Sequence, residues 1–264
     1  LIIMNSTKII ENISKWLKNY SVKSKTNGFI VGVSGGIDSA LTSTLCAKTG
    51  LPVLCLDLPI SQNNDEHKRA IKHIKWLKKN YKNVSFKTIN LTKTFLNFKS
   101  SVEISSNKKN LLSLANSRSR LRMTCLYYFA CIQNRLVVGT GNKVEDFGVG
   151  FYTKYGDGGV DISPIADLYK SEVFELSNKL GIINEIIKAK PTDGLWDDNR
   201  TDEDQIGATY KELEWAMKEK DNGKKTFEFE GRKKEVFEIL NKFNEQNLHK
   251  MKSIPIYLIP DELR

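Results

Sequence analysis

The spacing of hydrophobic residues changes from one segment of the chain to the next. Between residues 6 and 20 they recur every three to four positions, which predicts an amphipathic helix with Ser6 as its cap. Short apolar runs bounded by glycine or polar residues are typical of strands buried on both faces. The expected strands are 28–33, 51–58, 84–89 and 136–139. The expected later helices are 38–48, 66–79, 111–133, 170–181, 203–219 and 232–247.

Strands that alternate with helices indicate an α/β fold with a doubly wound parallel sheet. We expect one Rossmann-like domain over residues 1–264. Its parts are an N-terminal helix within 1–27, a nucleotide-binding core over 28–190, a lid loop at 190–202, and C-terminal helices and tail over 203–264. The lid is expected because a polar, aperiodic stretch of this length inside a compact domain commonly covers a binding site.

Composition narrows the range of partners. Lys plus Arg number 41 against 31 for Asp plus Glu, which gives a net charge of +10 and favours polyanionic ligands such as nucleotides. The lysines are scattered, so no nucleic-acid partner is expected. No apolar run approaches the roughly 20 residues that span a bilayer, and the start is too short for a signal peptide. We therefore expect a cytoplasmic protein without a membrane partner.

The four cysteines lie in apolar contexts and form no Cys-x-x-Cys pair. A zinc site needs more ligands at closer spacing. The pattern predicts buried, reduced thiols. The four are Cys46, Cys55, Cys125 and Cys131.

The most informative segment joins the first expected strand to the helix after it. It reads Gly32, Val33, Ser34, Gly35, Gly36, Ile37, Asp38, Ser39. Adjacent glycines let the backbone approach a ligand, and a helix N-terminus presents free N–H groups to an anion. The spacing matches neither a Walker A loop nor the dinucleotide glycine pattern. A carboxylate at Asp38 among phosphate donors calls for a bridging cation, for which Mg²⁺ is suited; the alternative is that Asp38 only caps the helix.

This loop resembles the pyrophosphate loop of the N-type ATP pyrophosphatases, of the adenine nucleotide alpha-hydrolase-like group. These enzymes split ATP into AMP and pyrophosphate and activate a carboxyl or carbonyl group as an adenylate. Further segments at 116–123 and 137–161, followed by a Lys, a Lys-Pro-Thr and a His-Lys, resemble the ammonia-dependent NAD synthetases in order and spacing. The resemblance extends over about residues 28–255, and its most specific piece is Lys-Tyr-Gly-Asp-Gly-Gly at 154–159.

The resemblance implies a ligase that forms a C–N bond in the last step of NAD biosynthesis. Deamido-NAD is adenylated by ATP and then aminated by ammonia, giving NAD, AMP and pyrophosphate. The implied ATP-binding residues are Gly32 to Ser39, Thr140, Lys170 and Thr192. The implied deamido-NAD-binding residues are Arg120, Lys154, Asp161, His249 and Lys250. The implied Mg²⁺ ligands are Asp38 and Glu145.

Two residues receive catalytic roles. The resemblance makes Lys170 a ligand of the ATP phosphates that stabilises charge on the transferring phosphorus; by position alone it is a surface helix lysine. Asp157 could take a proton from ammonium, or it could only form a turn, since Asp-Gly is a common turn pair. Position alone also makes Glu145 a solvated surface residue and His249 a structural histidine.

The chain departs from the family pattern at a few positions. Many members carry Asp-His where this chain has Gly141-Asn142, and an arginine where it has Asp57. One residue is inserted between Glu145 and Phe151. These changes affect expected contacts to adenine and ribose and leave the expected reaction as it is.

Rival functions remain open at this stage. One is another pyrophosphate-loop enzyme, such as a tRNA-modifying or GMP-synthetase-like one, and another is a non-catalytic nucleotide sensor. Free ammonia is the expected donor, because the synthetase pattern begins close to the N-terminus. The resemblance implies a homodimer with dinucleotide sites at or near the interface. The helices expected at 6–20 and 111–133 suit an interface or core packing equally.

Overall fold

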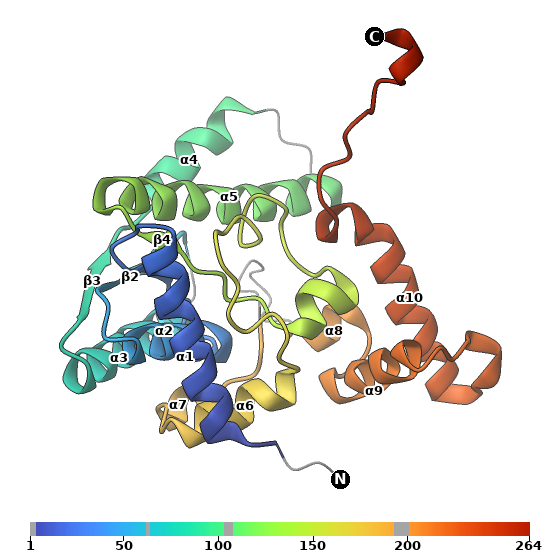
Figure 1. The fold of residues 1–264 in the computed structure, drawn as a ribbon, viewed down its shortest axis with the longest axis horizontal. Coiled ribbons are helices and arrows are strands. Elements are labelled where there is room, and N and C mark those ends of the chain that lie inside the picture. Colours follow the sequence, from blue (N-terminus) through green and yellow to red (C-terminus); the bar gives the residue numbers. More distant parts are fainter. Residues whose placement is uncertain (1–3, 62–63, 103–107, 193–200) are drawn as a thin grey trace.

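The computed structural model describes residues 4–61, 64–102, 108–192 and 201–264 (Figure 1). Its centre is a parallel sheet of four strands in the order β3-β2-β1-β4. The strands are β1 (Phe29–Gly32), β2 (Val53–Asp57), β3 (Val84–Thr88) and β4 (Leu136–Val137). The expected α/β fold with a parallel sheet is confirmed, and all four expected strands are present with shorter bounds.

Helices follow each strand and continue to the C-terminus. The α-helices are α1 (Ser6–Lys23), α2 (Ile37–Lys48), α3 (Asn64–Asn80), α4 (Thr92–Ser101), α5 (Lys108–Gln133), α6 (Lys170–Lys179), α7 (Asn184–Ile187), α8 (Asp202–Ile206), α9 (Tyr210–Asp221) and α10 (Gly231–Met251). Short turns of other helix types are the π-helix η1 (Val144–Val149) and the 3₁₀ helices η2 (Thr226–Glu228) and η3 (Asp261–Leu263).

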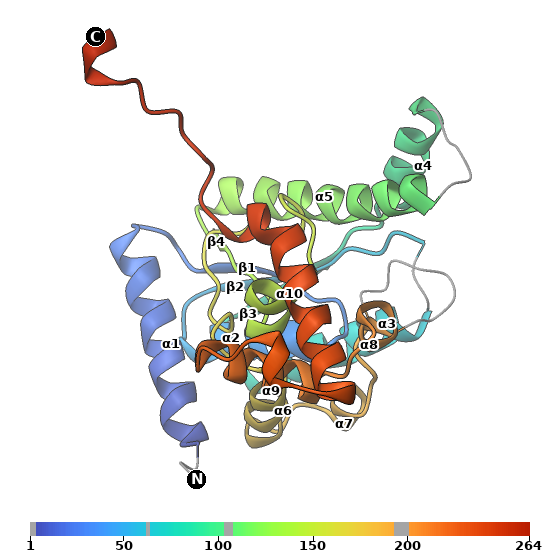
Figure 2. The same ribbon diagram turned by 90° about the vertical axis from the view of Figure 1, so that its right-hand side faces the viewer.

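Both faces of the sheet are covered, which explains why the inner strands β1 and β2 are buried along nearly their whole length, whereas the edge strand β3 is partly exposed. Phe29 and Val31 pack into the core shared with α1, α2, α3 and α6. Ile30 and Leu54 point to the opposite face, against α5. Figure 2 shows α5 lying over the sheet with α2 and α3 beneath it. Successive strand residues therefore serve different helix layers, as the two-residue period of a strand requires.

The last helices make a second, smaller core with η1. Leu213 of α9 and Phe237 of α10 are buried there beside Val144 and Val149. Beyond α10 the chain continues as an extended arm that projects from the body in Figures 1 and 2. Large apolar side chains on this arm are exposed. They are Ile254, Ile256, Tyr257, Leu258, Ile259 and Leu263.

Several local expectations were wrong for physical reasons. Asn5, not Ser6, caps α1, because the Asn5 side chain accepts a hydrogen bond from the Lys8 N–H. The helix expected over 203–219 is interrupted at Gly207, which adopts a left-handed conformation with φ of 86°. A Thr-x-x-Glu capping box then starts α9, so the break had a local signal in the sequence.

The cysteine prediction holds only in part. All four thiols are free, and Cys46 and Cys55 are buried. Cys125 is partly buried and Cys131 is exposed, because both lie on α5, whose outer face is open to solvent. The expected lid at 190–202 falls largely on residues 193–200, outside the described ranges. None of the helices in the described part of the chain is long and apolar enough to cross a membrane.

Candidate active site

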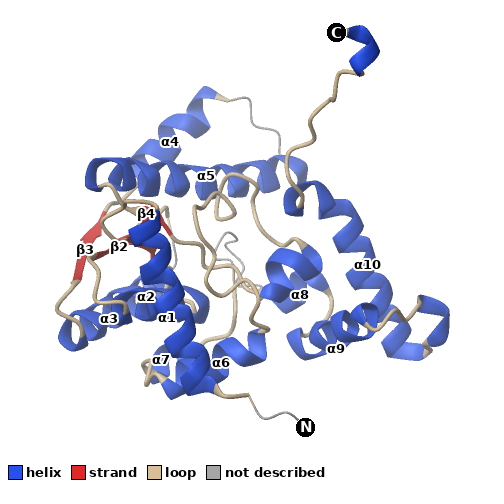
Figure 3. Ribbon diagram, viewed as in Figure 1, coloured by secondary structure: helices blue, strands red, loops and turns tan. Residues whose placement is uncertain are grey.

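A cavity of about 550 Å³ opens at the carboxyl edge of the sheet. This is where open α/β folds bind ligands, because strand ends and helix N-termini meet there. Figure 3 shows tan loop segments crossing the centre of the molecule between α5 and α6. Most of the expected site residues line the cavity. They are Gly32, Val33, Ser34, Gly36, Ile37, Asp38, Ser39, Thr140, Glu145, Asp157, Lys170, Thr192 and Lys250.

The loop after β1 has the geometry of an anion site. Gly35 is left-handed, with φ of +88°, and a Cβ atom there would lie 2.4 Å from the Glu66 carbonyl oxygen, so only glycine fits. Gly36 is the N-cap of α2, which turns the first N–H groups of that helix toward the cavity. The Ser34 N–H donates to Ser39 Oγ at 3.2 Å and closes the loop. Because Gly36 occupies the cap position, the alternative that Asp38 only caps the helix is wrong.

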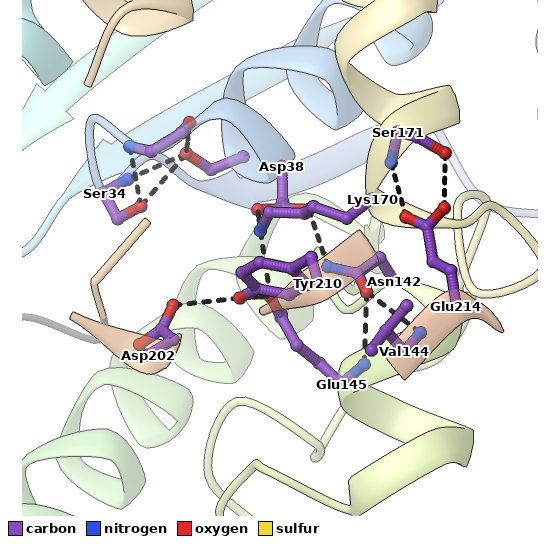
Figure 4. A network of polar contacts seen from close by, with 12 residues as sticks. Ser34, Asp38, Asn142, Val144, Glu145, Lys170, Ser171, Asp202, Tyr210 and Glu214 are labelled. Atoms are coloured by element: carbon purple, nitrogen blue, oxygen red, sulfur yellow. Dashed lines mark hydrogen bonds and ion pairs between the residues drawn. The ribbon is translucent and has the colours of Figure 1, made fainter. Parts of the chain in front are cut away.

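Asp38, Glu145 and Lys170 meet in what we call the lysine–carboxylate cluster (Figure 4). The Lys170 Nζ lies 2.6 Å from Asp38 Oδ2 and 2.9 Å from Glu145 Oε1. Its side chain is only 3% exposed, and each carboxylate is 17% exposed. The three residues come from α2, η1 and the first position of α6. Lys170 is therefore a buried residue rather than a surface helix lysine.

Two further side chains orient the cluster. Asn142 donates from Nδ2 to Asp38 Oδ1 at 2.9 Å, and its Oδ1 accepts from the Val144 and Glu145 N–H groups at 3.1 Å each. The Tyr210 hydroxyl donates to Glu145 Oε1 at 2.6 Å. Figure 4 shows these residues converging from separate elements. The carboxylates are thus held in position by neighbours that hydrogen-bond to them.

Charge within the cluster is unevenly balanced. Burial lowers the pKa of Lys170, but Asp38 and Glu145 outweigh it, so the pKa is raised and the amine stays an ammonium. Burial raises the pKa of Glu145, yet Lys170 and the Tyr210 hydrogen bond hold it below its usual value. Burial raises the pKa of Asp38, and the negative charge of Glu145 adds to this. Two carboxylates facing one ammonium leave an excess of negative charge that suits a further cation.

The carboxylates fit a magnesium ion in their chemistry. Mg²⁺ prefers oxygen ligands and is commonly held by one or two carboxylates together with substrate phosphates. Within the described ranges, no group of three or more His, Cys, Asp or Glu side chains could hold a metal by itself. Asp38 and Glu145 already share one cation, the Lys170 ammonium, so both point at a common position. Binding a metal at that position requires the lysine to move aside.

Asp157 faces the cavity from the glycine-rich segment after η1. Its Oδ1 accepts from Ser119 Oγ at 2.6 Å and from the Thr153 N–H at 3.1 Å, and its own N–H donates to Ser119 Oγ at 2.8 Å. The residue is exposed, so a small ligand can reach its carboxylate. The same hydrogen bonds organise the turn. The geometry is therefore compatible with a carboxylate that takes a proton from ammonium and with one that only forms the turn.

The expected dinucleotide residues are arranged differently. Arg120, Lys154, Asp161 and His249 do not line the cavity. Arg120 donates from Nε and Nη2 to the Lys154 carbonyl at 3.3 Å, and Lys154 Nζ donates to the His249 carbonyl at 2.7 Å. We call Arg120, Lys154 and His249 the outer basic group. Lys250 does line the cavity, with Nζ donating to the carbonyls of Gly150 and Tyr152 at 2.9 and 2.8 Å.

Asp161 stands apart from the outer basic group. Its Oδ2 accepts from the Val137 N–H at 2.8 Å, and its Oδ1 accepts from the Tyr127 hydroxyl at 2.9 Å. Both oxygens thus tie the segment after the glycine-rich loop to β4 and α5. The side chain still lies at the surface, where a ligand can meet it.

Sequence reasoning missed Asn142 and Tyr210 as parts of the site. In the sequence, Asn142 stands out only as a departure from the family pattern, and Tyr210 lies 65 positions from its partner Glu145. The Tyr210 pKa is raised by burial and by the charges of Glu145 and Asp202, which keeps the hydroxyl a donor. Its only local signal is its place at the start of α9, directly after the Thr209 cap.

The chain is similar to known proteins over nearly its whole length. The model of the NAD synthase family matches residues 9–254. An NH(3)-dependent NAD(+) synthetase of Methanosarcina acetivorans is 36% identical over 260 residues, covering 96% of this chain and 98% of the relative. Another, of Archaeoglobus fulgidus, is 36% identical over 264 residues, covering 98% and 100%.

Solved structures give the same picture of the fold. The NMN synthetase of Francisella tularensis superposes with a TM-score of 0.83 at 33% identity, covering 98% of this chain and 100% of the other. The NH3-dependent NAD synthetase of Campylobacter jejuni gives a TM-score of 0.78 at 28% identity, covering 97% and 100%. With its pyrophosphate-type loop and buried carboxylates at the sheet edge, the chain belongs to the NAD synthase family.

Proposed function

We propose that the protein catalyses the ATP-dependent amidation of deamido-NAD with ammonia, yielding NAD, AMP and pyrophosphate. The observation that carries this is the Lys170 ammonium held between Asp38 and Glu145, directly beside the N-terminus of α2. A buried cation, two carboxylates and free helix N–H groups form a site for a metal-bound polyphosphate. The relatives named NH(3)-dependent NAD(+) synthetase support the choice of substrate and donor.

The first step is adenylation. An oxygen of the nicotinate carboxylate attacks the α-phosphorus of ATP, and the bond from that phosphorus to the departing pyrophosphate breaks. The N–H groups of the Ser34–Ser39 loop and α2 receive the pyrophosphate, and Lys170 stabilises charge on the transferring phosphorus. Mg²⁺ held by Asp38 and Glu145 would supply neutralisation of the polyphosphate charge.

The second step is amination. Ammonia attacks the adenylated carbonyl carbon, and the bond from that carbon to the AMP oxygen breaks. Asp157 accepts a proton from ammonium to give the nucleophile, supported by its exposed position at the cavity wall. Thr140 and Thr192 line the same cavity and contact ATP in this proposal.

The dinucleotide is bound in part outside the cavity of one chain. Arg120, Lys154, Asp161 and His249 lie outside that cavity, while Lys250 reaches it. We propose a homodimer in which this outer surface adjoins the partner. Exposed apolar side chains on α5, the helix that carries Arg120, support an interface there; they include Tyr128 and Ile132.

A pyrophosphate-release assay tests the function. The purified chain is given ATP, Mg²⁺, ammonium and deamido-NAD, and NAD and pyrophosphate are quantified. We expect one NAD per pyrophosphate and no use of glutamine. Binding of ATP without release would favour a nucleotide sensor. Because the Francisella tularensis relative is an NMN synthetase, the deamido form of NMN is tested as a competing substrate. If the chain prefers it to deamido-NAD, NMN synthesis replaces NAD synthesis as the proposed function.

A further inference from the structure

Two arginines outside the expected set also line the cavity, on the side of the loop nearest β2. Arg69 belongs to α3 and Arg122 to α5. Each is anchored through Nε to a main-chain carbonyl. Arg69 Nε donates to the Gly35 oxygen at 3.3 Å, and Arg122 Nε donates to the Leu58 oxygen at 3.0 Å. Among the described residues, the terminal nitrogens of both guanidinium groups have no hydrogen-bond acceptor, and such nitrogens can bind a planar or tetrahedral anion.

The two carbonyls lie at matching positions along neighbouring strands. Val33 and Leu56 are hydrogen-bonded to each other, from N–H to carbonyl, at 2.9 Å. Gly35 and Leu58 each follow two residues later, so both arginines are anchored at one stretch of the sheet edge. Gly35 belongs to the Ser34–Ser39 loop, so this stretch includes part of that loop.

Close packing of α3 on the loop explains why Arg69 reaches it. An added Cβ at Gly35 would lie 2.4 Å from the Glu66 carbonyl oxygen and 3.0 Å from the Ala70 N–H nitrogen. The helix backbone therefore touches the loop backbone. The Arg69 Cβ lies 3.3 Å from the same added atom, so the Arg69 side chain starts beside the loop.

Among the described residues, neither Arg69 nor Arg122 has a carboxylate within ion-pair distance, and the buried Arg122 Nη2 has no hydrogen-bond partner. Glu66, Asp157 and Asp57 act on the Arg122 charge only from a longer distance. Lys170 differs, since two carboxylates contact it. A buried donor on a charged group is costly without a partner, and a bound anion supplies one. Burial lowers the pKa of Arg122 to about 10, which leaves it cationic at neutral pH.

We propose that Arg69 and Arg122 bind the pyrophosphate part of ATP, on the face of the Ser34–Ser39 loop away from the lysine–carboxylate cluster. This rests on the proposed function and adds two substrate ligands to it. The cluster carries excess negative charge and recruits a cation, whereas the arginines meet phosphate oxygens directly. Bidentate binding by a guanidinium suits a phosphate better than the point charge of a lysine.

Calorimetric titration of pyrophosphate in the presence of Mg²⁺ tests the pair. We expect Arg69→Gln and Arg122→Gln each to weaken binding roughly tenfold or more, and to raise the KM for ATP in proportion. Arg69→Lys and Arg122→Lys should recover only part of the loss. Lys68→Gln is the matched control, because it removes the same charge from an exposed neighbour on α3. The KM for deamido-NAD should stay unchanged throughout.

The outcomes distinguish a failure of the arginine proposal from a failure of the proposed function. If the native chain binds neither ATP nor pyrophosphate, the proposed function fails. If the native chain binds pyrophosphate and both glutamine variants bind it equally well, the arginine proposal is overturned while the function stands. An equal loss of pyrophosphate affinity in Lys68→Gln would also overturn it, since the loss would then come from the change in net charge and not from a contact with phosphate. If Arg122→Gln fails to fold, Arg69→Gln and the two lysine variants decide the result.

Discussion

The phosphate end of the cavity and the outer basic group are built in opposite ways. At the phosphate end, side chains from α2, η1 and α6 meet in a buried cluster whose charged atoms contact one another at 2.6 and 2.9 Å. In the outer basic group, Arg120 and Lys154 donate to main-chain carbonyls, and Arg120 and His249 are exposed. The carboxylates of the first region are held in position by Asn142 and Tyr210 before any ligand arrives. The second presents its charges outward.

In the proposed function, this difference corresponds to a division between chemistry and recognition. Charge stabilisation needs donors fixed in a site of low dielectric, so burial favours it. Recognition of a large dinucleotide needs a wide surface, which a single cavity of about 550 Å³ does not offer alongside ATP. Substitutions in the two regions should therefore produce different kinetic signatures.

Lys170→Met should give the largest effect. The rate should fall on the order of a thousandfold, because the ammonium that contacts both carboxylates is lost. Leaving the carboxylates buried and uncompensated should also cost about 3–5 kcal/mol of unfolding free energy. Mg²⁺ should restore more stability to this variant than to the native chain, as measured by thermal melts with and without the metal.

A surface ion pair near the site provides the control for Lys170. Lys143 lies 3.0 Å from Asp167, whose side chain is 97% exposed. Lys143→Met should cost at most about 1 kcal/mol and leave the rate nearly unchanged. Equal losses in both variants would mean that the buried cluster has no special role.

Asp157→Asn should come next. If the carboxylate accepts a proton from ammonium, kcat/KM for ammonium should fall on the order of a hundredfold near neutral pH. Raising the pH supplies free ammonia and should remove most of the deficit. A deficit that stays constant with pH would instead point to the turn, which Asp157 organises through Ser119 and Thr153.

Lys154→Gln probes the outer basic group and should have a more moderate effect. The KM for deamido-NAD should rise about tenfold, as expected for one charge-assisted hydrogen bond, while the KM for ATP stays constant. Lys252→Gln, an exposed residue just after α10, is the control. A matching rise in the KM for ATP would show that the two regions are not separate.

His73 should show the smallest effect at neutral pH and a clear one in acid. It is fully buried beneath the phosphate loop, with Nε2 3.0 Å from Ser43 Oγ of α2, and burial lowers its pKa from 6.5 to about 4. Folding favours the neutral imidazole. Its contribution to the free energy of unfolding is therefore complete above pH 6.5 and is lost as the pH falls toward 4. The loss is on the order of 3 kcal/mol.

Urea unfolding at pH 7.5 and 4.5 measures that loss. His73→Gln should make stability less dependent on pH over this window, and its rate at pH 7.5 should be close to native. An unchanged pH profile in the variant would assign the acid sensitivity to other groups.

The parts of the site that were predictable are those with local signals. The Ser34–Ser39 loop follows a buried strand and starts a helix, so three adjacent patterns agree. The meeting of Asp38 with Glu145 follows from topology, since both residues come after strands that pair as neighbours in the sheet. The loop was predictable from these local patterns, whereas the role of Glu145 was expected only from the family resemblance, because the strand order is known only from the structure.

Contacts between distant elements were not predictable in this way. Lys170 contacts Asp38 across 132 positions, and its helical pattern alone looks like that of a surface lysine. Cys131 has an apolar neighbourhood in the sequence, but exposed Tyr128 and Ile132 share its helix surface, so the apolar context did not mean burial. Tertiary packing determines whether such side chains are buried, and that packing cannot be read from a single sequence.

In the proposed function, the ammonium of Lys170 occupies the position of the incoming cation until that cation binds. Proteins whose fold depends on a bound metal collapse when it is chelated. Here Lys170 partly neutralises the two carboxylates, so the stability of the fold does not depend on a bound metal. The enzyme should therefore withstand EDTA with its melting temperature intact, lose turnover while the chelator is present, and regain it at once when Mg²⁺ returns.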